Sequence, residues 1–61
     1  MLTLDIYESD TGLFYGTTAD YHGFLVAEHS LAEVLQGTLR ALADLREAGA
    51  NMPTLEGVTL S

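Results

Sequence analysis

The sequence contains no cysteine and no tryptophan, a single proline, and only two basic residues. Without cysteine the chain can form neither a disulfide nor a thiolate metal site, a composition that fits a reducing compartment, so we expect a cytoplasmic protein. No apolar run approaches the roughly 20 residues that a membrane span requires. The N-terminus also lacks the basic and apolar regions of a signal peptide. Neither membrane insertion nor secretion is therefore expected.

The charge is strongly one-sided. Nine acidic residues against two basic ones give a formal net charge of -7 in 61 residues, of which 48% are hydrophobic. So many hydrophobic residues exclude a disordered acidic tail, and the charge must belong to the surface of one small folded domain. Such a surface repels nucleic-acid phosphates and anionic lipid and attracts basic proteins. The simpler interpretation is that acidity only keeps a small protein soluble.

The first half of the chain has the pattern of strands. Leu2, Leu4 and Ile6 alternate with polar residues, the period of a strand with one buried face. Residues 8–12 contain the Asp and Gly typical of a hairpin loop, and residues 13–18 follow as a second strand. These two segments predict an antiparallel hairpin.

A third strand is predicted over residues 24–28, after a turn at residues 19–23. Its short apolar run is typical of a central strand. Gly16, in the middle of the second strand, indicates either a bulge or the close approach of another group.

A helix is predicted to begin after Ser30, which with Glu33 forms a capping box. Gly49 is placed to end the helix near Ala48. An apolar stripe recurs at steps of three and four residues and should face the sheet. The stripe consists of Leu31, Val34, Leu35, Thr38, Leu39, Leu42 and Leu45. Gly37 and Ala41 lie on one flank, where small residues would fit beneath the sheet edge or admit another backbone.

The remaining residues 50–61 are expected to form a weak edge strand around residues 58–60 or a flexible tail. The chain as a whole is thus predicted to be one α+β domain spanning residues 1–61. We expect a three- or four-stranded antiparallel sheet with one amphipathic helix packed on one face, because only this arrangement buries both the leucine stripe and one sheet face.

Candidate catalytic residues lack partners. His22 lies in a turn, and His29 precedes the helix cap without a third ligand at metal-binding spacing. Ser30 already has a capping task, and no serine lies in a strand-to-helix elbow. The glycines do not form a phosphate-binding loop. We therefore expect no enzyme activity, no metal and no cofactor.

Binding to a protein is the more natural expectation. The aromatic residues of two-sided strands cannot all enter one core, and those left exposed are natural interface anchors. These are Tyr7, Tyr15 and Tyr21. The acidic residues expected to contact a basic partner are Asp5, Glu8, Asp10, Asp20, Glu33, Asp44 and Glu47.

The order of these motifs resembles the HicB-like antitoxin family. Residues 10–16 (DTGLFYG) look like the family's Asp/Gly turn into an aromatic strand, residues 19–23 (ADYHG) like its second turn, and residues 30–33 (SLAE) like its helix cap. The match covers roughly residues 2–48. Residues 50–61 are too few for the family's DNA-binding tail, so the resemblance is to a short HicB-like domain.

This resemblance implies a protein that neutralises a small basic RNase toxin by covering its active surface. The charge and size equally fit a phage-encoded anti-CRISPR inhibitor that mimics DNA and occupies a basic groove of an effector complex. In both cases the partner is a basic nucleic-acid-binding protein, with no direct contact to nucleic acid or membrane. A third interpretation is a structural homodimer, formed by sheet-edge pairing or through the Gly37 flank.

Overall fold

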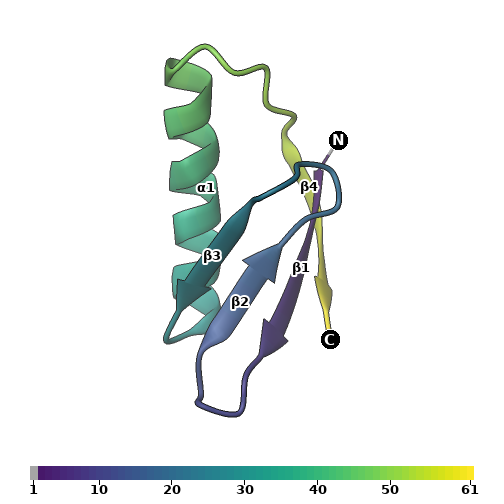
Figure 1. The fold of residues 1–61 in the computed structure, drawn as a ribbon, viewed down its shortest axis with the longest axis vertical. Helices are drawn as coiled ribbons and strands as arrows, with labels where there is room; N and C mark the ends of the chain where they lie inside the picture. The colour runs from purple at the N-terminus through teal and green to yellow at the C-terminus, as the bar shows by residue number, and fades with distance from the viewer. Residues whose placement is uncertain (1) are drawn as a thin grey trace.

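The computed structural model describes residues 2–61, which form one sheet covered on one face by one helix (Figure 1). The elements in chain order are β1 (Leu2–Glu8), β2 (Phe14–Thr17), β3 (Leu25–Glu28), α1 (Leu31–Glu47) and β4 (Leu55–Leu60). The sheet has the order β3-β2-β1-β4. The predicted α+β fold is confirmed. Across residues 2–61, no helix has both the length and the apolar character needed to cross a bilayer.

Two details of the predicted sheet are wrong. β4 pairs in parallel with β1, so the sheet is mixed instead of antiparallel. The cause is the helical crossover, because α1 carries the chain back along the sheet and β4 then starts at the same end as β1. β4 thereby occupies the second side of β1 and leaves β3 as an edge strand instead of a central one. β4 is also longer than the predicted edge strand around residues 58–60, since it has six residues.

The ends of α1 are fixed by the predicted residues. The Ser30 Oγ accepts a hydrogen bond from the backbone N–H of Glu33 (3.2 Å) and donates one to the Glu33 carboxylate (2.9 Å). Gly49 follows the helix with a φ of +96°, which only glycine adopts without strain. Arg46 donates to the carbonyls of Met52 (3.4 Å) and Pro53 (2.8 Å) and so holds the crossover against the last turn.

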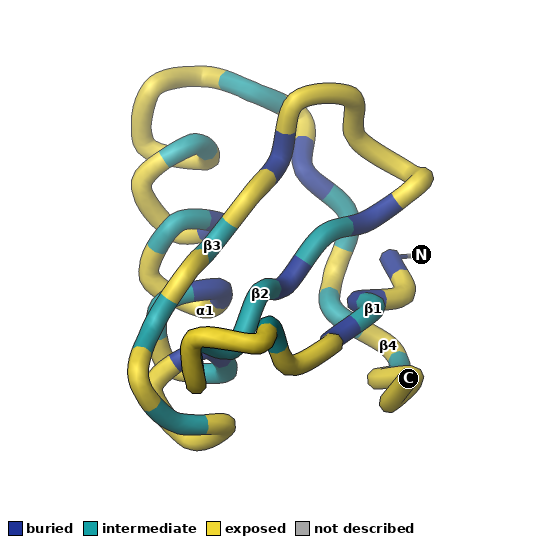
Figure 2. The backbone as a smooth tube through the Cα atoms, turned by 60° about the horizontal axis from the view of Figure 1, so that its bottom comes forward, coloured by how far each residue is buried: buried dark blue, intermediate teal, exposed yellow. Residues whose placement is uncertain are grey.

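The core lies between α1 and the middle of the sheet (Figure 2). Leu2, Leu4 and Ile6 of β1 are buried, as their alternation predicts. The helical stripe is narrower than predicted. Leu39 is 56% exposed and Leu31 lies at 36%, because a single helix presents only about a third of its circumference to a sheet. The stripe residues that are fully buried are Val34, Thr38 and Leu42.

Two glycines let the helix and the sheet approach closely. A Cβ on Gly16 would lie 2.8 Å from Cγ1 of Val34, and one on Gly37 would lie 3.0 Å from Cγ1 of Val26. Gly16 thus marks a close approach and not a bulge. The Gly37 flank faces β3 of the same chain, where its small residue serves intramolecular packing.

Adding a methyl group at Gly16 should therefore be costly. We expect Gly16→Ala to destabilise the domain by about 1–3 kcal/mol, because the methyl group overlaps Val34 and the helix must shift. Gly57→Ala is the matched control, since nothing lies within 4 Å of its Cβ position. The measurement is urea unfolding followed by circular dichroism. Equal stability of the two variants would contradict the close packing described.

Two buried threonines should respond in opposite directions to the same substitution. Thr38 is 0% exposed, and its hydroxyl has no hydrogen-bond partner among residues 2–61. Thr18 is also buried, but its hydroxyl accepts from the Asp20 N–H at 3.1 Å. We expect Thr38→Val to stabilise and Thr18→Val to destabilise the domain, each by about 1 kcal/mol. Chemical denaturation of both variants tests the difference, and a loss of stability in Thr38→Val would contradict it.

Candidate functional site

The helix leaves one face of the sheet uncovered. Because side chains alternate along a strand, the β1 residues that alternate with the buried Leu2, Leu4 and Ile6 point away from α1. The register extends this second face across all four strands. We call it the open face, and its residues are Thr3, Asp5, Tyr7, Tyr15, Thr17, Leu25, Ala27 and Thr59.

Two aromatic side chains predicted as anchors meet on the open face. Tyr7 and Tyr15 are cross-strand partners, and their rings stack with centroids 5.3 Å apart and planes at 20°. Tyr7 remains 42% exposed. Phe14 directly precedes Tyr15 in β2, and its side chain instead faces α1 and packs against the core. The alternation along β2 thus separates a core aromatic from a surface one.

A carboxylate lies beside this tyrosine pair. Asp5 is two residues from Tyr7 on β1 and therefore on the same face, opposite Thr17 of β2. A planar guanidinium is attracted both to the negative face of an aromatic ring and to a carboxylate. The combination of Asp5, Tyr7 and Tyr15 is therefore chemically suited to receive an arginine side chain. It offers no nucleophile and no acid–base pair.

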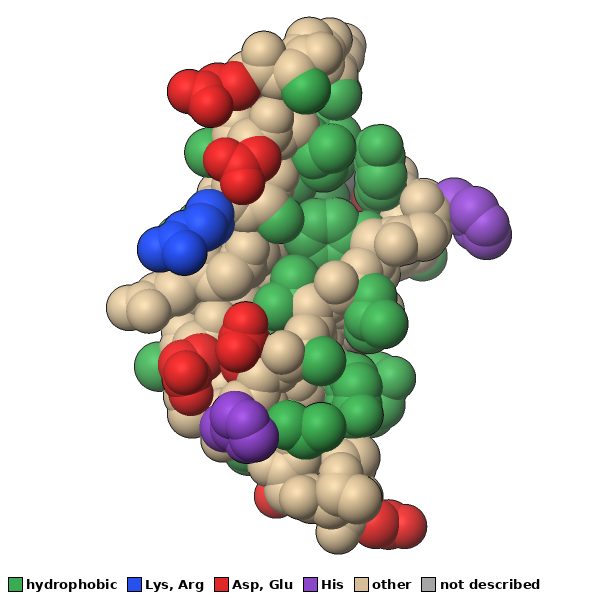
Figure 3. Space-filling model, turned by 60° about the vertical axis from the view of Figure 1, so that its left-hand side comes forward, with side chains coloured by type: hydrophobic (Ala, Val, Ile, Leu, Met, Phe, Trp, Pro, Cys, Tyr) green, Lys and Arg blue, Asp and Glu red, His purple; other side chains and the backbone are tan. Residues whose placement is uncertain are grey.

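The other predicted acidic residues are spread around the molecule. Glu8 and Asp10 are exposed at the β1–β2 hairpin, and Asp44 and Glu47 are exposed on α1. Glu33 is exposed as well, although its carboxylate accepts from the cap residue. Figure 3 shows acidic side chains along the helix side of the molecule with a basic side chain among them. Of the predicted contact residues, the fold brings Asp5, Tyr7 and Tyr15 together on one face of the sheet.

Asp20 has a structural task that its position in a loop did not reveal. Its carboxylate accepts from the backbone N–H of Thr3 (3.0 Å) and from the hydroxyl of Thr18 (3.3 Å). β2 ends at Thr17, so the N–H of Thr3 lies beyond the last backbone partner. The carboxylate therefore takes the place of a missing strand residue and ties the loop to β1. Tyr21, one residue on, is 38% exposed and stands apart from the tyrosine pair.

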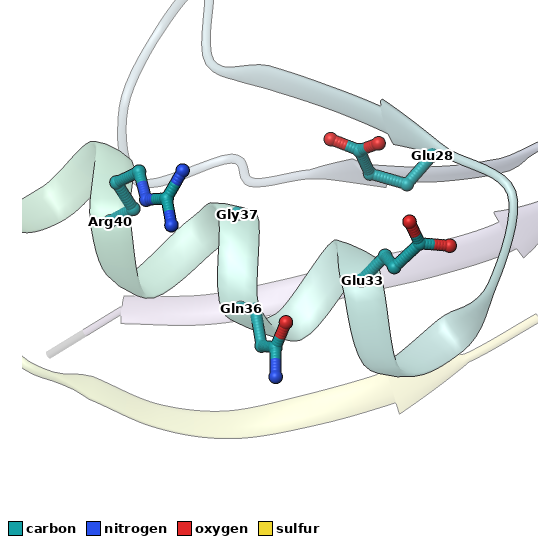
Figure 4. A pocket seen from close by; sticks show the side chains of 5 residues that line it. All are labelled: Glu28, Glu33, Gln36, Gly37 and Arg40. Atoms are coloured by element: carbon teal, nitrogen blue, oxygen red, sulfur yellow. The ribbon is translucent and has the colours of Figure 1, made fainter.

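A shallow groove of about 170 Å³ lies between β3 and α1. It is lined by Glu28, Glu33, Gln36, Gly37 and Arg40. In Figure 4 the two carboxylates come from the strand and from the helix, and Arg40 stands further along the same groove. Sequence reasoning missed Glu28, because the apolar run before it gave no sign that its side chain turns toward the helix. The groove is smaller than typical small-molecule pockets of 300–1,000 Å³.

Both histidines are exposed and lie in the loops where the sequence places them. Among residues 2–61 no group of three or more potential ligands is placed to hold a metal ion. In comparisons with known proteins, no family model, no curated protein and no solved structure matches the chain.

The structural task of Asp20 is testable against a second acidic residue. We expect Asp20→Ala to lower the free energy of unfolding by about 1 kcal/mol, because the Thr3 N–H loses its partner. Asp10→Ala removes the same charge from an exposed loop position and should change it by less than about 0.5 kcal/mol. Urea midpoints of the two variants give the comparison. Similar midpoints would show that the Asp20 carboxylate holds nothing in place.

Proposed function

We propose that this chain is a non-catalytic acidic binding protein that inhibits a basic nucleic-acid-binding partner by covering the partner's binding surface. The observation that supports it is the exposed tyrosine stack beside Asp5 on the open face, in a chain with a net charge of -7. A HicB-like antitoxin acting on a small RNase in the cytoplasm fits this proposal. The sequence resemblance and the absence of cysteine support those two finer points.

The proposed binding proceeds in two physical stages. At long range the net negative charge attracts a basic protein and raises the rate of encounter. At contact, an arginine of the partner stacks on Tyr7 and places its guanidinium near the Asp5 carboxylate. Cation–π contacts contribute about 0.5–2 kcal/mol, more when water is excluded. The open face around the pair then covers the surface on which the partner would hold phosphates.

The anti-CRISPR alternative rests on a different surface. Exposed carboxylates of Glu33, Asp44 and Glu47 along α1 present negative charge where a DNA mimic would present it. Arg40 interrupts that series, and no exposed aromatic residue accompanies it on the helix. The antitoxin proposal therefore depends on the open face, and the anti-CRISPR alternative depends on the outer face of α1. The two functions are separable by the residues on which binding depends.

A hexa-arginine peptide is a suitable first probe for the open face. We expect Tyr7→Ala to weaken binding of this peptide at least about tenfold, because the stacking surface is removed. The charge-neutralising control is Asp44→Asn on α1, which should change the affinity less than about threefold. Titration calorimetry gives both affinities. A larger loss of affinity in Asp44→Asn than in Tyr7→Ala would favour binding at α1 and contradict binding at the open face.

Binding of the natural partner should also depend on salt. We expect the affinity to fall at least about tenfold between 50 and 300 mM salt, because charge attraction is screened over a Debye length of about 10 Å or less. The partner is to be captured from host lysate at low salt and identified by mass spectrometry. A basic RNase encoded beside this gene would favour the antitoxin function, and a CRISPR effector subunit would favour the alternative. An acidic partner held equally well at high salt would contradict both.

A further inference from the structure

We infer that the outer edge of β4 is the interface of a twofold homodimer, in which β4 pairs antiparallel with β4 of a second copy. The two four-stranded sheets would then form one continuous eight-stranded sheet. The inference goes beyond the proposed function and concerns the edge of the sheet instead of its open face. It rests on the hydrogen-bonding groups, the apolar side chains and the charge distribution at this edge.

β4 has a complete row of backbone groups directed outward. The N–H of Ser61 donates to the carbonyl of Ile6 at 2.9 Å, which fixes the parity of the parallel ladder. By alternation the N–H and C=O groups of Val58 and Leu60 point away from β1. The strand contains no proline and no lysine, two of the devices by which monomeric proteins protect an edge. The outward groups of Val58 and Leu60 are therefore open to pairing.

The side chains along this edge are apolar and incompletely covered. Val58 is 43% and Leu60 is 65% exposed, on the face of the sheet that carries α1. Leu60 and Leu31 line a common groove of about 190 Å³. Leu39 is two residues from Gly37, about 200° around the helix and so on the opposite flank, and it is also exposed. The other flank, with Gly37, faces β3. These four residues are what a second copy would cover.

Charge explains why the occupant is a second copy. Two chains of net charge -7 repel each other, so their contact is favoured where acidic residues are few and far apart. Glu56 is the one acidic residue of β4, and the acidic residues of α1 are Glu33, Asp44 and Glu47. With the twofold axis at Val58, Glu56 of each copy lies opposite Leu60 of the other. The two Glu56 residues are then about 14 Å apart along the strands, beyond the Debye length of about 8 Å. The other acidic residue at this edge is Glu8, which lines the groove beside Leu60. The exposed side chains of Val58, Leu60, Leu31 and Leu39 outnumber these two acidic residues, which favours an identical edge over a basic partner.

Proline substitution separates the dimer from the fold. Val58→Pro removes an N–H that points outward, so the pairing of β4 with β1 remains and only the pairing with a second copy is lost. Thr59→Pro is the matched control at the neighbouring residue. The N–H of Thr59 faces β1, so the loss of this N–H disrupts the domain itself. The mass of the chain is to be measured by sedimentation equilibrium and light scattering, and the fold by circular dichroism.

We expect the unmodified chain to have twice the mass of 6.6 kDa at about 0.1 mM protein. Val58→Pro should raise the dimer dissociation constant at least about thirtyfold while keeping the far-ultraviolet spectrum. A monomeric unmodified chain at this concentration would overturn the inference, as would an unaltered dimer in Val58→Pro. If that variant unfolds, Leu60→Lys gives the same test through an exposed side chain, since two lysines would oppose the contact.

A covalent test uses the absence of cysteine. Val58→Cys places two thiols beside the proposed axis, where the Cα atoms of paired residues lie about 5.5 Å apart, within disulfide range. We expect a disulfide-linked dimer under mild oxidation, at least about tenfold faster than for Ala43→Cys on the exposed face of α1. Equal rates would contradict pairing at β4. Tyr15→Ala removes the other ring of the stack and lies outside the groove beside Leu60, so it should leave the dimer intact. Val58→Pro should still bind hexa-arginine, so each proposal can fail without the other.

Discussion

One helix can cover one face of one sheet, and every exposed feature of this protein follows from that limit. α1 packs over the sheet so closely that Gly16 and Gly37 are needed at the contact. The buried residues of β1 and α1, together with Phe24 and Met52 from the connecting segments, form the core between the two layers. No second layer remains for the opposite face, which therefore keeps its tyrosines exposed. A chain of 61 residues buries only about 60% of its unfolded surface, so such uncovered surface is expected at this size.

The two surfaces that the helix leaves uncovered differ in chemistry. The open face combines a tyrosine stack with the Asp5 carboxylate, which suits a cationic side chain. The β4 edge offers unpaired backbone groups and leucines with few charges, which suits an identical edge. A twofold axis perpendicular to the sheet would place both helices on one side of the joined sheet and both open faces on the other. A basic partner with two arginine clusters would then meet two sites in one plane, and its avidity would exceed the affinity of either site.

Local chemistry made the helix and the hairpin predictable. The Ser30 cap, the glycine after the helix and the alternation in β1 are short-range signals, and each has the predicted role. The direction of β4 and the edge position of β3 depend on how the crossover places distant segments, which no window of neighbouring residues encodes. The same limit applies to Leu39, because helical periodicity identifies a face but not the width that the sheet covers.

The candidate site was predictable in part for the same reason. The strands predicted surplus aromatic residues, and alternation places Tyr7 and Tyr15 on the surface. That the two rings stack depends on the register Tyr7↔Tyr15, which the hairpin sets and composition does not. Asp20 had the charge expected of a contact residue, yet it holds the Thr3 N–H at the end of β2. A carboxylate in a loop thus served the fold, which is a role that net charge cannot distinguish from binding.

The parallel pairing of β1 with β4 also has a consequence for synthesis. Within this domain β1 is synthesised before the other strands and β4 after them, yet the two are neighbours. The N–H of Leu2 donates to the carbonyl of Thr54, and the N–H of Ser61 donates to the carbonyl of Ile6. One edge of β1 therefore stays unpaired until nearly the whole domain has been translated. Contacts between such distant residues slow folding. Until β4 is present, the hairpin and the helix lack one strand of their sheet, so the pairing of β4 with β1 is the event that completes the sheet.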